Sequence, residues 1–71
     1  MDRFAVVIPY TEPEGEHPDR VYEAALEVSA QSPGQAKVLA TREFKHLSDL
    51  SWARGTRQII TDGIKITKTA P

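Results

Sequence analysis

The fold is decided by residues 21–47, VYEAALEVSAQSPGQAKVLATREFKHL. The first ten residues of this stretch alternate between apolar and mostly polar side chains. A period of two is typical of a strand with one buried face. The apolar members are Tyr22, Ala24, Leu26, Val28 and Ala30, and between them lie Glu23, Ala25, Glu27 and Ser29. We therefore predict a strand over residues 21–31.

The pattern changes at residues 32–35, which carry the signals of a helix start. Ser32 can act as the N-cap, Pro33 suits the first helical position, and Gln35 lies where a capping box places Glu or Gln. The apolar positions that follow are spaced three to four residues apart and form one stripe of a helix: Ala36, Leu39, Ala40, Phe44 and Leu47. An amphipathic helix therefore follows the strand.

A helical alternative exists for residues 21–31. Glu, Ala and Leu at positions 23–27 are good helix formers, and Asp19 can cap a short helix. The alternation holds over five successive apolar positions, however, so the strand is the favoured interpretation.

A second strand is predicted at residues 4–10, FAVVIPY, with Phe4, Val6, Ile8 and Tyr10 on one face. Pro9 has no N–H to donate, so we expect it at the end of the strand or on a sheet edge. Residues 11–20, TEPEGEHPDR, are rich in proline and acid and read as a loop that joins the two strands.

The C-terminal stretch 57–69, RQIITDGIKITKT, also favours strand. Asp62-Gly63 is a type I′ turn signal, which predicts a tight hairpin of residues 57–61 with 64–69. A single strand with a bulge at Gly63 is the alternative. Between the helix and this stretch, residues 48–52 read as the helix end or a short turn and 53–56 as a loop. We expect Trp52 to pack on the core.

These elements predict one α+β domain over residues 1–71. Its order is β-β-α-β(-β), with a small antiparallel sheet of three to four strands and one main helix packed on one face. One helix cannot cover both faces of the sheet, so the second face stays open. We expect this open face to be an interface, and its candidate residues are Ala5, Val7, Val21, Ala25 and Ile60.

The composition limits how such a domain can be stabilised. A chain of 71 residues buries only about 60% of the surface that its unfolded form exposes. There is no cysteine, which excludes disulfides and the usual zinc sites, and we predict no metal or cofactor. Association with another chain is the remaining support. No apolar run could span a membrane and the N-terminus lacks a signal pattern, so we expect a cytoplasmic protein with no membrane partner.

The charge is distributed unevenly although the net charge is only −1. Residues 1–35 carry seven acids and two bases, whereas residues 36–71 carry seven bases and three acids. A basic half can contact phosphates, although opposite charges can also meet within the fold. The candidate nucleic-acid-binding residues are Arg42, Lys45, Arg54, Arg57 and Lys65.

Catalytic chemistry has little support in the sequence. His17 lies in the acidic loop, whose prolines break the ligand spacing that a hard cation needs, and His46 lies near the end of the helix. Neither a nucleophile with its base nor a glycine-rich phosphate loop is present. We expect no enzyme activity and name no catalytic residue.

The function expected from the sequence is therefore binding. The leading hypothesis is a small protein-interaction or adaptor domain that self-associates as a homodimer. The alternative is a nucleic-acid-binding accessory protein that uses the basic half. The joint at residues 26–36 resembles the strand-to-helix joint of many small α+β domains, ribosomal and phage accessory proteins among them, and implies no particular activity.

Overall fold

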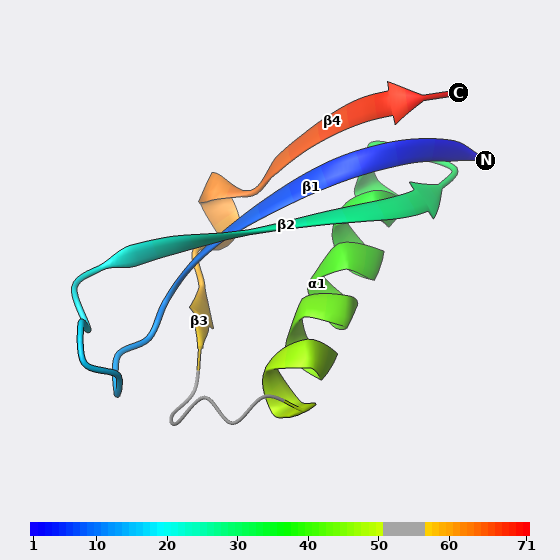
Figure 1. Cartoon of the computed structure of the whole chain (residues 1–71). Coiled ribbons are helices and arrows are strands. Elements are labelled where there is room, and N and C mark those ends of the chain that lie inside the picture. The colour runs from blue at the N-terminus through cyan, green and yellow to red at the C-terminus, as the bar shows by residue number, and fades with distance from the viewer. Residues whose placement is uncertain (51–56) are drawn as a thin grey trace.

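The computed structural model describes residues 1–50 and 57–71 and has the predicted α+β architecture (Figure 1). One helix packs on one face of an antiparallel sheet. The elements in chain order are β1 (Asp2–Thr11), β2 (Val21–Ala30), α1 (Pro33–Leu50), β3 (Gln58–Ile59), the 3₁₀ helix η1 (Thr61–Gly63) and β4 (Lys65–Ala70). Residues 21–30 form a strand, so the favoured interpretation of that stretch is confirmed.

The central strand of the sheet is β1. It pairs along its whole length with β2, from Asp2 opposite Ala30 to Thr11 opposite Val21. Its other edge pairs first with β4 and then with β3. Each of these pairings is antiparallel, and the outer edge of β2 has no partner among the described residues.

The predicted hairpin of residues 57–61 with 64–69 is wrong. β3 and β4 do not pair with each other, because both pair with β1, and Thr61–Gly63 forms a turn of 3₁₀ helix between them. The result is closer to the alternative of one strand interrupted near Gly63. The free edge of β1 is ten residues long and offers hydrogen-bond partners to both segments. The turn propensity of Asp62-Gly63 depends only on neighbouring residues, so it could not predict that β1 would pair with both segments.

Pro9 lies inside the central strand and is buried, contrary to its expected place at a strand end or sheet edge. The carbonyl of Pro9 accepts a hydrogen bond of 2.9 Å from the Ile60 N–H. The N–H and C=O of a residue in an antiparallel strand point to the same edge of the strand. The N–H that Pro9 lacks would therefore face the edge of β1 that pairs with β3 and β4. The chain leaves the ladder there to form η1, and no donor is needed from Pro9.

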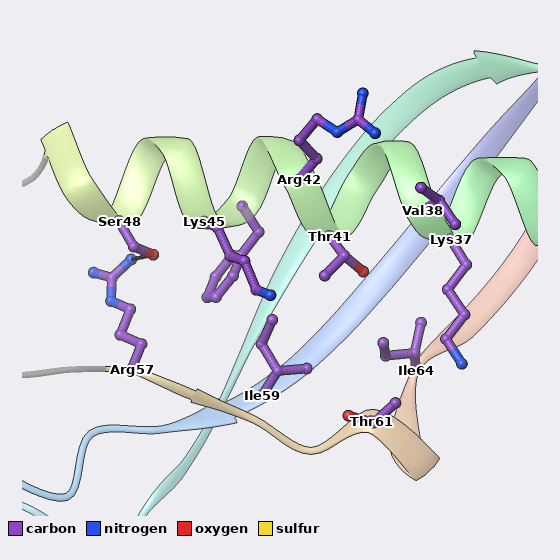
Figure 2. Close-up of a pocket in the computed structure, with 11 residues that line it drawn as sticks. Lys37, Val38, Thr41, Arg42, Lys45, Ser48, Arg57, Ile59, Thr61 and Ile64 are labelled. Carbon is purple, nitrogen blue, oxygen red and sulfur yellow. Dashed lines mark hydrogen bonds between the residues drawn. The ribbon is translucent and has the colours of Figure 1, made fainter.

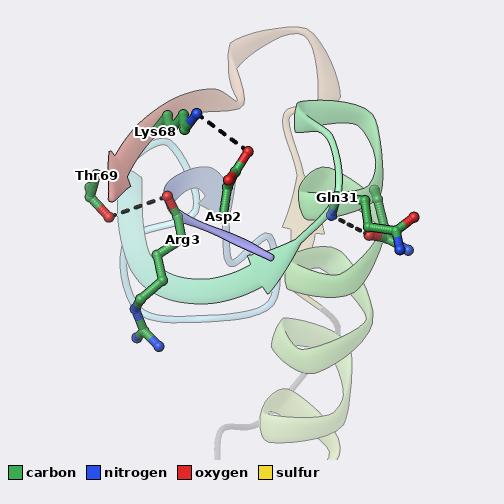
Figure 3. A network of polar contacts seen from close by, with 6 residues as sticks. Asp2, Arg3, Gln31, Lys68 and Thr69 are labelled. Carbon is green, nitrogen blue, oxygen red and sulfur yellow. Dashed lines mark hydrogen bonds and ion pairs between the residues drawn. The ribbon is translucent and has the colours of Figure 1, made fainter. Parts of the chain in front are cut away.

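The start of α1 is capped as the sequence predicts. The Gln35 N–H donates to Ser32 Oγ at 3.1 Å, and the Gln31 N–H donates to Gln35 Oε1 at 2.6 Å (Figure 3). These bonds satisfy N–H groups at the helix entrance that have no partner within the helix. The helix continues to Leu50, three residues beyond the predicted apolar stripe. Trp52 and the expected loop 53–56 lie outside the described residues.

The core lies between α1 and the inner faces of β1 and β2. Its buried members are Phe4, Val6, Ile8, Ala30, Ala36, Ala40 and Phe44. The alanines of α1 bring the helix backbone close to the sheet, because they place no long side chain between the two layers. Leu47, which was expected in the buried stripe, is 48% exposed. Figure 1 shows the reason: α1 crosses the strands obliquely, and its C-terminal end lies away from β2.

The two chain termini lie side by side at one end of the sheet (Figure 1). Lys68 Nζ lies 3.4 Å from Asp2 Oδ2, and the Thr69 hydroxyl donates to the Arg3 carbonyl at 3.3 Å (Figure 3). The ion pair is partly exposed, so we expect it to contribute at most about 1 kcal/mol.

Candidate binding surfaces

The face of the sheet opposite α1 is open, and we call it the open face. On this face, Val7 of β1 lies between Ala25 of β2 and Lys65 of β4. Two residues earlier in β1, Ala5 lies between Glu27 of β2 and Thr67 of β4. The register therefore brings three of the predicted interface residues together in one apolar patch: Ala5, Val7 and Ala25. The patch is only partly accessible, because Ala5 and Val7 are half-buried while Ala25 is exposed.

The other two predicted interface residues lie toward the far end of the sheet. Val21 pairs with Thr11 at the last position of β2 and is 55% exposed. Ile60 follows β3, bonds to the Pro9 carbonyl and is 38% exposed. Val21 is four residues from Ala25, or about 13 Å along the strand, so it does not belong to the central patch.

Charges of opposite sign flank the apolar patch of the open face. Glu23 and Glu27 lie on the β2 side, and Lys65 lies on the β4 side. Arg3 Nη2 approaches Glu27 Oε2 at 3.5 Å, with both side chains more than half exposed. Glu23 lies opposite Pro9, which carries no charge. The face therefore carries two acids on its β2 edge and one base, Lys65, on its β4 edge.

A second surface lies on the helix side of the sheet, and we call it the basic groove. It is a depression of about 1050 Å³ between α1 and the segment that carries β3, η1 and the start of β4 (Figure 2). The helix contributes Lys37, Val38, Thr41, Arg42, Phe44, Lys45 and Ser48 to its lining. The opposite wall consists of Arg57, Ile59, Thr61 and Ile64.

The groove exists because α1 covers only part of the sheet. The helix packs most extensively on β2 and less on β1 and β4, and it has no comparable contact with β3. Ile59 and Ile64 pack on the edge of the core but remain half-buried rather than buried. Sequence reasoning placed the uncovered area only on the other face of the sheet and therefore missed this surface.

The candidate nucleic-acid-binding residues do not form one patch. Lys45 and Arg57 point into the basic groove, while Arg42 stands at its rim and points away from the opposite wall (Figure 2). Lys65 belongs to the open face, on the other side of the sheet. Arg54 lies outside the described residues.

Lys37 is a groove residue that the sequence analysis left out. In the structure Lys37 and Lys45 project into the same groove (Figure 2). The signal was present in the sequence, because Lys37, Thr41 and Lys45 recur every four residues and so lie along one side of a helix.

Arg57 closes one end of the groove. Its guanidinium carbon lies 5.1 Å from the ring centroid of Tyr10 and 5.8 Å from that of Phe44, and Nη1 donates to Ser48 Oγ at 3.3 Å. Stacking on two rings fixes the guanidinium in place. Its Nε is buried and has no hydrogen-bond partner among the described residues.

The histidines are separate from both surfaces. His17 is exposed in the loop between β1 and β2, and His46 is exposed on α1. Among residues 1–50 and 57–71, no group of three His, Asp or Glu side chains is arranged to hold a metal ion. Within the same residues, no helix has the length and apolar character required to cross a membrane.

Comparisons with protein-family models, with curated proteins and with solved structures found no match to this chain. Function must therefore be inferred from the two surfaces themselves.

Proposed function

We propose that this chain is a non-catalytic protein-interaction domain that forms a homodimer through its open face. The observation that carries the proposal is the opposite charge of the two edges of that face, with an apolar patch between them. A face with this arrangement is complementary to a second copy of itself in one orientation.

The orientation follows from the order of the strands. When two copies meet face to face about a twofold axis parallel to the strands, β2 of one copy lies over β4 of the other. Lys65 and Ala25 both pair with Val7, so Lys65 of one copy faces Ala25 of the other, between Glu23 and Glu27. A twofold axis across the strands would instead place β2 over β2 and acid against acid. Charge therefore selects the first orientation.

The shape of the chain is consistent with association. Its radius of gyration is 12.7 Å and its accessible surface is 5057 Å², compared with about 11 Å and about 4,400 Å² for a compact domain of this length. β1 and β2 are ten residues long and β3 and β4 share the position on the other side of β1, so the sheet has a face of roughly 500 Å². This is less than the about 800 Å² per partner of a standard interface, so we expect a dissociation constant that is roughly micromolar.

The test is molar mass in solution by light scattering, at protein concentrations from about 5 to 500 μM and at about 0.1 and 0.5 M salt. We expect the mass to rise from 7.9 kDa toward twice that value with concentration, and to rise less at the higher salt concentration. Lys65→Glu should abolish the dimer, because it places acid between Glu23 and Glu27 of the second copy.

The decisive variant combines Lys65→Glu with Glu23→Lys. In the proposed orientation this pair exchanges the two charges across the interface, so the dimer should return. Glu43→Lys on α1 changes an exposed acid away from the open face and serves as the control, which should dimerise normally. A monomer under all conditions would refute the proposal. A dimer that tolerates Lys65→Glu would also refute it, and would indicate pairing through the free edge of β2.

A further inference from the structure

The basic groove is independent of the open face, and its charge identifies the kind of ligand that it can hold. Lys37, Lys45 and Arg57 point into it, and no acidic side chain is present among its described lining residues. The hydroxyls of Thr41 and Thr61 add neutral donors. Because the rest of the described lining supplies no counter-charge, a negatively charged ligand would be complementary to this surface.

The apolar residues of the lining restrict the chemical class of ligand further. Ile59 and Ile64 are half-buried along the strand wall, and Val38 is 55% exposed on the helix wall. The only ring in the described lining, that of Phe44, belongs to a residue that is 4% exposed and is covered by Arg57. The groove therefore offers aliphatic contacts but no accessible ring on which a nucleobase could stack.

The spacing of the two lysines gives the length of the ligand. Lys37 and Lys45 are eight residues apart on α1, or about 12 Å along the helix. In an extended peptide, residues four apart are separated by about 13 Å and point to the same side, while the first and third residues between them point to the opposite side. Figure 2 shows Ile59 and Ile64 across the groove from this stretch of α1.

We propose that the basic groove binds an extended protein segment in which two acidic residues lie four positions apart and the first and third residues between them are aliphatic. The carboxylates point toward α1 and pair with Lys37 and Lys45, and the two aliphatic side chains point to the opposite wall and pack on Ile59 and Ile64. Arg57 adds positive charge at the end of the groove, where its guanidinium is held on the rings of Tyr10 and Phe44. The proposal does not depend on the dimer, because it uses the opposite side of the sheet.

The test uses a fluorescein-labelled peptide with the core Glu-Leu-Ser-Leu-Glu and the full chain, with binding measured by fluorescence anisotropy. Lys45→Glu should weaken binding about tenfold or more, because a charge-assisted contact is lost and a repulsion is added. Replacing both Leu residues of the peptide with Ser should also weaken binding severalfold. Amide shifts in NMR spectra should move at Thr41 and Thr61 and not at Ala25.

Lys65→Glu is the matched control, since it makes the same charge reversal on the open face. It should abolish the dimer and leave peptide affinity unchanged. Lys45→Glu should weaken peptide binding and leave the dimer unchanged. The two proposals can therefore fail separately. If no binding is detected up to about 1 mM peptide, the proposal is wrong, because a dissociation constant above this value corresponds to nonspecific contacts. Equal affinity for the Leu and Ser peptides overturns it as well. Tighter binding of a single-stranded oligothymidylate, lost in Lys45→Glu, assigns the groove to nucleic acid instead.

Discussion

Gly63→Ala should destabilise the fold, because the 3₁₀ turn packs directly on the central proline. A Cβ at Gly63 would lie 2.8 Å from Pro9 Cγ, whereas carbon atoms in contact are normally about 3.5–4.0 Å apart. Pro9 is buried inside β1 and its ring is rigid, so the turn itself must shift. Overpacking of this kind costs about 1–3 kcal/mol.

The expected magnitude is the difference between two opposing effects. Replacing Gly with Ala removes conformational freedom from the unfolded chain, which stabilises the fold by about 0.4–1 kcal/mol. Subtracting this gain from the middle of the overpacking range, about 2 kcal/mol, leaves a net loss of about 1–1.6 kcal/mol in the free energy of unfolding. For a domain of this size, each kcal/mol changes the midpoint of thermal unfolding by about 4–8 °C.

The assay is urea and thermal denaturation followed by circular dichroism, with Gly34→Ala as the control. A Cβ at Gly34 meets nothing closer than Ser32 Oγ at 4.0 Å, and the site lies in the first turn of α1. That variant should be stabilised by up to about 1 kcal/mol. The same substitution is therefore expected to have opposite signs at the two positions.

A double-mutant cycle isolates the contact. Pro9→Ala removes the Cγ atom, so Gly63→Ala should cost about 1 kcal/mol less in that background than in the wild type. Strict additivity of the two substitutions, or a Gly63→Ala variant as stable as the wild type, would contradict the packing of η1 on Pro9.

Three further predictions concern stability and use the same denaturation assay. Ser32→Ala should lower the free energy of unfolding by about 1 kcal/mol, because the N-cap bond to the helix is lost; an unchanged value would rule out the cap. Ala40→Leu should cost about 1–3 kcal/mol because it places a larger side chain between α1 and the sheet, whereas Val38→Leu on the exposed side of α1 should change stability by less than about 0.5 kcal/mol. Asp2→Asn should lower stability by less than about 1 kcal/mol, and the difference should disappear at high salt, since the ion pair with Lys68 is partly exposed.

Much of the candidate interface could be predicted from sequence because a strand has a strict period of two. Once β1 and β2 were recognised, Val7 and Ala25 had to lie on the face opposite Phe4 and Leu26. The groove was less predictable. Its position depends on the oblique crossing of α1 over the strands (Figure 1), which no local pattern in the sequence encodes.

The sequence by itself determined the two long strands, the capped helix and the α+β class, because these depend on periodicity and on contacts between near neighbours such as Ser32 and Gln35. The tertiary structure alone decided where residues 57–69 pair and why Pro9 is tolerated in the central strand. Asp62-Gly63 favours a hairpin locally, but the free edge of β1 pairs with both segments and places their isoleucines beside the core. Backbone hydrogen bonds and burial gained where both segments pair with β1 outweigh a local turn preference, and they join residues 47 to 67 positions apart in the chain.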